Sequence, residues 1–158
     1  MAIEYAFNHP AEAVYQLLTD RDFLSERLEA VGEDPADIQL RKQGKKVNIV
    51  YQRAARRDVP KVAAKVIGSV QAFSMRETWQ PDGDGWSGDY LIEFKGVPAS
   101  VSADFELMPT DTGCVYRITH KPKVSMPLIG KTLEKVLRSQ VEDGCDEEID
   151  YLAAALDG

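Results

Sequence analysis

The sequence predicts an α+β fold, in which a curved antiparallel sheet of seven strands carries two short helices and one long C-terminal helix. Two observations predict it. Between residues 73 and 120, apolar and polar residues alternate along four segments separated by turns that contain Gly or Pro, as in an antiparallel sheet with one wet face. From Pro127 to Leu156, apolar residues recur every three or four positions, which places them along one side of a helix. A helix this one-sided needs a broad apolar surface, and the sheet would supply it.

The composition is that of one ordinary globular domain spanning residues 1–158. No apolar run approaches the roughly 20 residues that a membrane span requires, and the N-terminal stretch lacks the pattern of a secretory signal. The two cysteines, Cys114 and Cys145, form no CxxC pair and are too few for a disulfide framework. We therefore expect reduced thiols in a cytoplasmic protein.

The charge is acidic overall but unevenly spread. The net charge of −7 disfavours nucleic acid as a partner. Residues 41–65 nevertheless hold nine basic residues against one acid, so this segment carries +8 and the rest of the chain −15. The segment is either a set of solvated strand faces and loops, or a docking patch for an anionic membrane or an acidic partner. Its basic residues are Arg41, Lys42, Lys45, Lys46, Arg53, Arg56, Arg57, Lys61 and Lys65.

The N-terminal third predicts a strand followed by two helices. Alternating residues from Ile3 to Phe7 indicate a short strand, which Pro10 ends. A first helix follows, and Asp20 caps a second helix that ends at Gly32. Further strands are expected around residues 38–40 and 47–53, with a turn at 43–45 between them, and residues 61–67 predict one helical turn.

The four best-patterned strands can be aligned through the turns that join them. A slip of one residue would turn every side chain to the other face, so the alternation restricts the register. Gly88, in the interior of a strand, indicates a bend or a close approach of another chain segment. The turns predict three opposing pairs, namely Trp79 with Trp86, Phe94 with Ala99, and Leu107 with Cys114.

The C-terminal helix is expected to begin at about Pro127, with Ser125 or Met126 as its cap. Gly144 lies inside it, where glycine costs roughly 1 kcal/mol relative to alanine. It would either let the helix approach the sheet or let it bend over a cavity. The apolar stripe consists of Ile129, Leu133, Leu137, Val141, Cys145, Ile149, Leu152 and Leu156.

Two local stretches and the order of elements resemble a known superfamily. The first runs from Phe7-Asn8-His9-Pro10-Ala11-Glu12-Ala13-Val14 into Leu18-Thr19-Asp20, and the second is Pro127-Leu128-Ile129-Gly130 before the last helix. The chain resembles the START-like helix-grip superfamily, which includes the birch-pollen allergen and polyketide cyclases, and within it an uncharacterised bacterial family. The resemblance implies a cavity between sheet and long helix, usually for an apolar small molecule. It implies no particular activity, because the fold hosts many.

Candidate catalytic groups are few, and the residues predict no cofactor and no metal site. His9 precedes a helix and is interpreted as a capping or surface residue, whereas His120 falls on the inward face of the last strand. Neither cysteine has an adjacent basic residue that would lower its pKa. Glu77 shares an inward face with apolar residues, where a carboxylate is costly unless it is paired. It either reaches water at a cavity mouth or pairs with Arg53.

The predicted ligand site is the inward face of the sheet together with the helix stripe. Tyr and Trp would supply apolar contact and a polar handle, and Glu77, His120, Tyr90 and Tyr116 would be the polar groups. The site residues are Phe73, Met75, Glu77, Trp79, Trp86, Tyr90, Ile92, Phe105, Tyr116, Ile118, His120, Leu133, Leu137 and Val141.

Three functional classes remain open from the sequence. The first is non-enzymatic binding of an apolar small molecule, such as a lipid or a polyketide-like molecule. The second is a cyclase- or hydrolase-like enzyme, which would need Glu77, Tyr90, Tyr116 and His120 to converge on one polar spot. The third is a surface adaptor that acts through residues 41–65. The sequence sets neither the ligand nor the oligomeric state.

Overall fold

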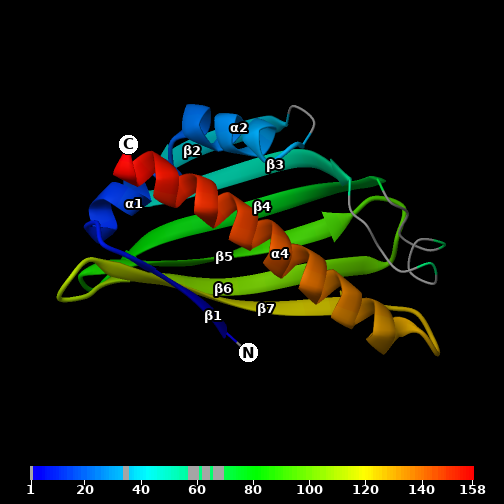
Figure 1. Ribbon diagram of the computed structural model, residues 1–158. Coiled ribbons are helices and arrows are strands. Elements are labelled where there is room, and N and C mark those ends of the chain that lie inside the picture. Colours follow the sequence, from blue (N-terminus) through cyan, green and yellow to red (C-terminus); the bar gives the residue numbers. More distant parts are fainter. Residues whose placement is uncertain (1, 34–35, 57–60, 62–64, 66–69) are drawn as a thin grey trace.

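A computed structural model describes residues 2–33, 36–56, 61, 65 and 70–158. In this part of the chain, a seven-stranded antiparallel sheet has the order β1-β7-β6-β5-β4-β3-β2, and the long helix α4 runs diagonally across one face (Figure 1). The predicted helix-grip arrangement is therefore confirmed. The elements are β1 (Ala2–Phe7), α1 (Ala11–Leu18), α2 (Arg21–Ala30), β2 (Asp37–Gln43), β3 (Lys46–Arg56), β4 (Val70–Asp82), β5 (Gly85–Phe94), β6 (Ala99–Pro109), β7 (Cys114–Val124) and α4 (Gly130–Asp157).

The ends of α2 follow the signals in the sequence. Asp20 accepts hydrogen bonds from the backbone N–H groups of Asp22 and Phe23, at 2.9 and 3.2 Å, and so caps the first turn. At the other end, Gly32 adopts a φ of 88°, and the N–H of Glu33 reaches back to the carbonyl of Leu28. This is a Schellman motif, in which the residue after the glycine is turned back over the helix end. It places Glu33 where it meets β3.

The predicted strand faces are confirmed, but two of the three predicted registers are wrong by two residues. Trp79 lies opposite Gly88 rather than Trp86, because β4 continues through Pro81 to Asp82 and only two residues form the turn to β5. In the same way, Cys114 lies opposite Pro109 rather than Leu107. A slip of two keeps every side chain on its face, so the inward set is unchanged.

The register between β5 and β6 agrees with the prediction from Phe94 and Ala99, as the pair Ile92 and Val101 shows.

The glycine in the interior of β5 marks a close approach. A Cβ on Gly88 would overlap the carbonyl oxygen of Thr78 and would lie 2.7 Å from the ring of Phe105. Any larger residue would displace the backbone of β4, so this position requires glycine.

The start of α4 differs from the prediction. The helix begins at Gly130, not at Pro127, and Ile129 rather than Ser125 or Met126 precedes it. Leu128 has a φ of 68°, in the left-handed region, so a right-handed helix cannot pass through it. The sequence shows a proline suited to a first turn but carries no signal for a left-handed leucine.

The apolar stripe of α4 faces the sheet as predicted, although not uniformly. Leu133, Leu137, Ile149 and Leu152 are buried, whereas Val141 in the middle of the helix is half-buried. The helix packs mainly against β7, α1 and α2. It therefore has dense contacts near its two ends and spans the central strands between them (Figure 1).

Two predictions fall on the segment between β3 and β4. Most of the helical turn expected at residues 61–67 lies outside the described residues, as do residues 57–60 of the basic segment. In the described part of that segment, Arg53 is buried. It therefore does not belong to a surface patch, and its charge is used inside the protein.

We expect Leu137→Asp to destabilise the fold by several kcal/mol, because the side chain at this position is fully buried and an unpaired carboxylate there is costly. Equilibrium unfolding in denaturant measures the change. Ser139→Asp, at an exposed position on the same helix, is the matched control and should change stability little. An unchanged melting temperature for Leu137→Asp would contradict the packing of α4 described above.

Candidate functional site

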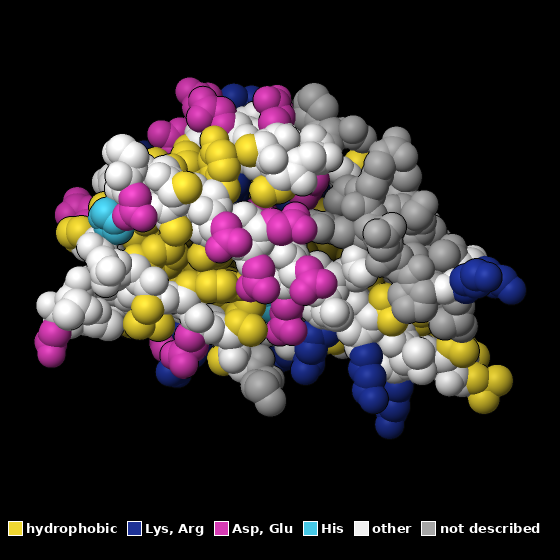
Figure 2. All heavy atoms as spheres, viewed as in Figure 1, with side chains coloured by type: hydrophobic (Ala, Val, Ile, Leu, Met, Phe, Trp, Pro, Cys, Tyr) yellow, Lys and Arg dark blue, Asp and Glu magenta, His cyan; other side chains and the backbone are white. Residues whose placement is uncertain are grey.

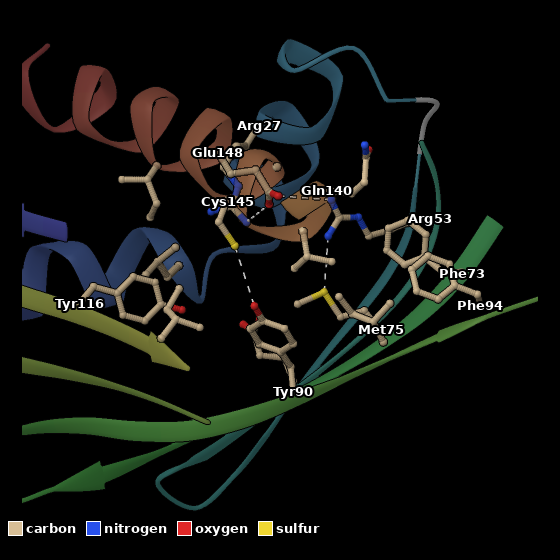
Figure 3. Close-up of a pocket in the computed structure, with 17 residues that line it drawn as sticks. Arg27, Arg53, Phe73, Met75, Tyr90, Phe94, Tyr116, Gln140, Cys145 and Glu148 are labelled. Atoms are coloured by element: carbon tan, nitrogen blue, oxygen red, sulfur yellow. Dashed lines mark hydrogen bonds and ion pairs between the residues drawn. The ribbon is translucent and has the colours of Figure 1, made fainter. Parts of the chain in front are cut away.

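A cavity of about 80 Å³ lies between α4 and the sheet (Figure 3). The sheet supplies its floor from β3, β4, β5 and β7, while α1, α2 and α4 supply its roof. In Figure 3, Cys145 projects from α4 toward Tyr90, which rises from the sheet, and Glu148 projects toward Arg53. The lining residues are Leu18, Arg27, Arg53, Phe73, Met75, Glu77, Tyr90, Ile92, Phe94, Tyr116, Ile118, Gln140, Val141, Gly144, Cys145, Glu148 and Ile149.

Eight of the fourteen residues predicted from the sequence line this cavity. They come from β4, β5, β7 and α4, and they include three of the four predicted polar groups. The eight are Phe73, Met75, Glu77, Tyr90, Ile92, Tyr116, Ile118 and Val141.

The other six predicted residues lie elsewhere in the fold. Trp79 and Phe105 pack against each other in the solid core, with ring centroids 4.5 Å apart. Trp86 is half-buried and stacks on Tyr15 of α1, with centroids 4.2 Å apart and an interplanar angle of 7°. The remaining three are fully or almost fully buried beside the cavity without lining it, namely His120, Leu133 and Leu137.

A buried ionic cluster contributes three of its four residues to the lining of the cavity. The guanidinium of Arg53 donates to both carboxylate oxygens of Glu33, from Nε at 3.0 Å and from Nη2 at 2.6 Å. Nη2 of Arg53 also lies 3.4 Å from Glu148, whose other oxygen is 2.9 Å from Nη2 of Arg27. We call Arg27, Glu33, Arg53 and Glu148 the ionic cluster. It joins α2, the turn after α2, β3 and α4.

The ionic cluster corrects one prediction. Arg53 pairs with Glu33 and Glu148, not with Glu77. Burial alone would lower the pKa of Arg53, but the carboxylates of Glu148 and Glu33 raise it, so the residue stays charged. Its guanidinium also lies over the ring of Phe73, with 5.0 Å between the guanidinium carbon and the ring centroid. Paired and stacked in this way, the charge is tolerated inside the protein.

Arg27 is less completely paired than Arg53. Its Nη2 meets Glu148, but its Nε is buried without a hydrogen-bond partner among the described residues. Arg27 lines the cavity as a residue, but this nitrogen itself has almost no accessible surface. A buried donor left unpaired costs free energy.

Glu77 lies at the floor of the cavity and differs from the ionic cluster in having no positive partner in direct contact among the described residues. Its Oε2 accepts a hydrogen bond from Nε1 of Trp79 at 2.7 Å. Burial raises the pKa of Glu77 to about 7, against the opposing effects of the Trp79 hydrogen bond and of Arg27. Near neutral pH this carboxyl can therefore hold a proton and act as a hydrogen-bond donor.

A second polar cluster, formed by Tyr90, His120 and Cys145, joins the sheet to α4. The hydroxyl of Tyr90 is hydrogen-bonded to Nε2 of His120, and Sγ of Cys145 lies 3.9 Å from both atoms. Burial, and then Arg138, lower the pKa of His120 to about 4, so the imidazole is neutral. Burial, and then Glu148, raise the pKa of Cys145 to about 12, so the thiol keeps its proton. Neither group is activated as a base or a nucleophile.

Nine lining residues were missed by the sequence-based prediction, and two of them had a usable signal. Arg27 follows Leu24 by three positions in α2, and Glu148 follows Cys145 by three in α4, so each charge stands on an apolar stripe. A charged residue in such a position indicates a buried partner. The nine are Leu18, Arg27, Arg53, Phe94, Gln140, Gly144, Cys145, Glu148 and Ile149.

Fold and cavity together define a helix-grip protein, in which a long helix closes over a curved antiparallel sheet. The chain belongs to the family described as "Protein of unknown function (DUF2505)", whose model matches residues 2–156. No curated protein matches the sequence. Among the described residues, no helix is long and apolar enough to cross a membrane, and no group of His, Cys, Asp and Glu is arranged to hold a metal ion.

Solved structures with the same fold share little sequence with this chain. TTHA0849 from Thermus thermophilus has a TM-score of 0.66 at 16% identity, over 98% of this chain and 94% of its own. Ara h 8.0201 has a TM-score of 0.61 at 16% identity, over 98% and 97%. The di-domain ARO/CYC StfQ from the steffimycin biosynthetic pathway has a TM-score of 0.65 at 15% identity, over 98% of this chain and 49% of its own. The fold is typical of proteins that bind hydrophobic ligands.

The raised pKa of Glu77 predicts a pH-dependent stability. Between about pH 4.5 and pH 7 the folded protein keeps the Glu77 proton while the unfolded chain releases it, so this group makes stability fall as pH rises. Gln cannot ionise and can still accept the Trp79 hydrogen bond. The stability of Glu77→Gln relative to wild type should therefore increase by about 2–3 kcal/mol from about pH 5 to about pH 8.

Urea unfolding of both proteins at the two pH values measures this difference. His120, whose lowered pKa acts in the opposite direction below about pH 6.5, is common to both proteins and cancels. Glu26→Gln, at an exposed position of α2, is the control for the side-chain change itself. The same difference between Glu77→Gln and wild type at both pH values would contradict a protonated Glu77.

Proposed function

We propose that this protein binds a mostly apolar small molecule, such as a lipid or a polyketide-like molecule, in the cavity between the sheet and α4, without transforming it. One observation carries the proposal: the lining of a single cavity combines apolar side chains with charged and polar ones. Phe73, Phe94 and Ile92 supply apolar lining, whereas Arg27, Arg53, Glu148 and Glu77 supply charged and polar lining. Figure 3 shows Arg53 beside Phe73. Ligand pockets commonly combine apolar walls with a few placed polar groups.

The polar wall favours an uncharged polar group on the ligand. The two guanidinium groups of the ionic cluster are balanced by Glu33 and Glu148, so the cluster offers no net charge to attract an ion. Glu77 lines the cavity and can donate a hydrogen bond when protonated. We therefore expect the ligand to present a carbonyl or hydroxyl oxygen to this wall and its apolar body to Phe73 and its neighbours.

The volume of the cavity limits how a ligand can be held. Pockets that enclose drug-sized molecules measure roughly 300–1,000 Å³, well above the 80 Å³ found here. Full enclosure therefore requires α4 to move away from the sheet. Its middle is suited to this, because Val141 is only half-buried and Gly144 brings no side chain into the space. The densely packed ends of α4 would act as fixed points.

The enzyme alternative draws on one specific observation, the contact between Tyr90, His120 and Cys145 next to the cavity. The comparison with StfQ, an ARO/CYC protein, concerns the fold alone at 15% identity. With a pKa of about 4, the imidazole of His120 is a weak base, and with a pKa of about 12, the thiol of Cys145 stays protonated, so both are poor catalysts at neutral pH. Binding without catalysis is therefore favoured.

Both cysteines are free, and we place the protein in the reducing environment of the cytoplasm.

Gly144 offers a direct test of the cavity. A leucine there would fill the space, while leaving α4 a better helix former than glycine does. We expect Gly144→Leu to weaken binding of a fluorescent apolar probe by at least about tenfold, and Gly144→Ala, the matched control, to weaken it much less. Tyr90→Ala should also change the affinity, because it removes a wall and enlarges the cavity. Thermal melting shows whether each variant is folded.

The natural ligand is sought by solvent extraction and mass spectrometry of the purified protein. Under the proposal, extracts of wild type contain an apolar compound that is depleted in folded Gly144→Leu. Equal probe affinity in wild type and folded Gly144→Leu would overturn binding in this cavity. Conversion of an extracted compound by wild type, lost in His120→Ala, would favour the enzyme alternative.

A further inference from the structure

The connection between β7 and α4 presents an exposed leucine in a strained conformation. Among the described residues, Leu128 is the one large hydrophobic residue that is exposed, and its side chain is fully accessible to solvent. Among the described residues it is also the one non-glycine residue whose backbone lies in the left-handed region, with a φ of 68°. We call residues 125–129 the β7–α4 tip.

The two features of Leu128 both cost free energy in the isolated protein. A left-handed backbone is unfavourable for a residue with a Cβ, and asparagine or glycine would adopt it more easily. An exposed leucine gains nothing from the hydrophobic effect until a partner covers it. Strained residues persist where the surroundings hold them, and they are concentrated at functional sites.

The surroundings hold the β7–α4 tip firmly. Met126 and Ile129, on either side, are half-buried against the core. The N–H of Ser125 donates to the carbonyl of Pro98 in the β5–β6 turn at 2.9 Å, and the side chain of Glu134 accepts from the N–H of Val124 at 3.1 Å. Leu128 is thus presented outward on an anchored turn rather than on a loose loop.

Basic side chains surround this apolar point. Between residues 121 and 138 the chain has five basic residues and one acid, whereas residues 139–158 have seven acids and no basic residue. Figure 2 shows hydrophobic side chains at the tip where α4 begins, with Lys and Arg side chains projecting beside it and acidic side chains over the middle of α4. The exposed lysines at this end are Lys95, Lys121, Lys123, Lys131 and Lys135.

We propose that the β7–α4 tip docks onto an anionic lipid bilayer, with Leu128 inserted among the lipids and the surrounding lysines against the headgroups. An apolar side chain framed by lysines matches a surface that is negative outside and apolar below. The acids on the second half of α4 would be repelled from the same surface, which orients the molecule with its tip toward the membrane. This proposal uses residues outside the cavity and does not depend on what the cavity binds.

The test is co-sedimentation of the full-length protein with vesicles of equal parts phosphatidylglycerol and phosphatidylcholine at low salt. Wild type should bind these vesicles, should bind pure phosphatidylcholine vesicles weakly, and should be released as salt rises. Leu128→Asn should lower the partition coefficient at least about fivefold. Its melting temperature should be unchanged or higher, because asparagine tolerates the left-handed conformation.

The charge contribution is tested with a double variant and a matched control. Lys131→Glu with Lys135→Glu should reduce binding by more than about 25-fold, since each lysine near an anionic surface is worth about fivefold and the change reverses its charge. The control is Lys45→Glu with Lys46→Glu, which makes the same change of charge in the β2–β3 turn. That turn belongs to the basic segment 41–65 and lies at the other end of the sheet from the β7–α4 tip. The strand register places Arg53, Phe73 and Phe94 at the same end of the sheet as Val124, which precedes the tip.

Insertion itself has a separate readout. Leu128→Trp should show fluorescence quenching by brominated lipids, whereas the wild-type tryptophans, in the core and stacked on α1, should not. Vesicle binding that is absent at low salt would overturn the proposal and leave an acidic protein as the partner for the lysines. Binding that survives Leu128→Asn and the tip lysine variant but is lost in the control would also overturn it, and would place the membrane contact in residues 41–65.

Discussion

The architecture depends on how α4 is held above the sheet. A helix can cover a cavity only if contacts elsewhere carry it, because the hydrophobic effect would otherwise draw it down until the space closed. Leu133 and Leu137 bury the first half of α4, and Ile149 and Leu152 bury the second. Between these two anchor regions the stripe changes to Val141, Gly144 and Cys145, which fill less space or are only half-buried. The cavity lies where the side chains are smallest.

Polar contacts reinforce the same arrangement from several directions. Tyr5 of β1 donates to Asp146 at 2.7 Å, and His9, just before α1, lies 2.7 Å from Asp157 at the end of the helix. The ionic cluster ties Glu148 to both α2 and β3. An ionic cluster contributes less net stability than apolar packing of the same volume, but removing one partner from it is costly. Its role here is to define where α4 sits relative to α2 and the sheet.

The cavity is buried and the β7–α4 tip is exposed, yet α4 borders both. Phe94 of the cavity wall ends β5, and the turn that follows contacts the tip through Pro98 and Ser125. The proposed ligand site and the proposed membrane contact are therefore neighbours in the fold, although each rests on its own residues.

The sequence by itself determined the elements of this protein and the face of each strand that turns inward. Both follow from local periodicity: a two-residue period in strands and a 3.6-residue period in helices are properties of the backbone, so they are readable without the fold. Asp20 and Gly32 marked the ends of α2 for the same local reason. Even the two wrong registers left the inward set intact, because they were wrong by an even number of residues.

Only the tertiary structure decided which inward residues meet a cavity and which fill the core. Trp79 and Tyr90 both fall on the inward face in the sequence pattern. Trp79 is packed among aromatic rings, whereas Tyr90 lines the cavity below α4. This difference depends on how elements far apart in the chain pack together. The pairing of Arg53 with Glu33 and Glu148 depends on the same long-range geometry, as does the left-handed Leu128 that delays the helix. Local patterns indicate that a residue is buried, whereas the packing of the whole chain determines which residues it contacts.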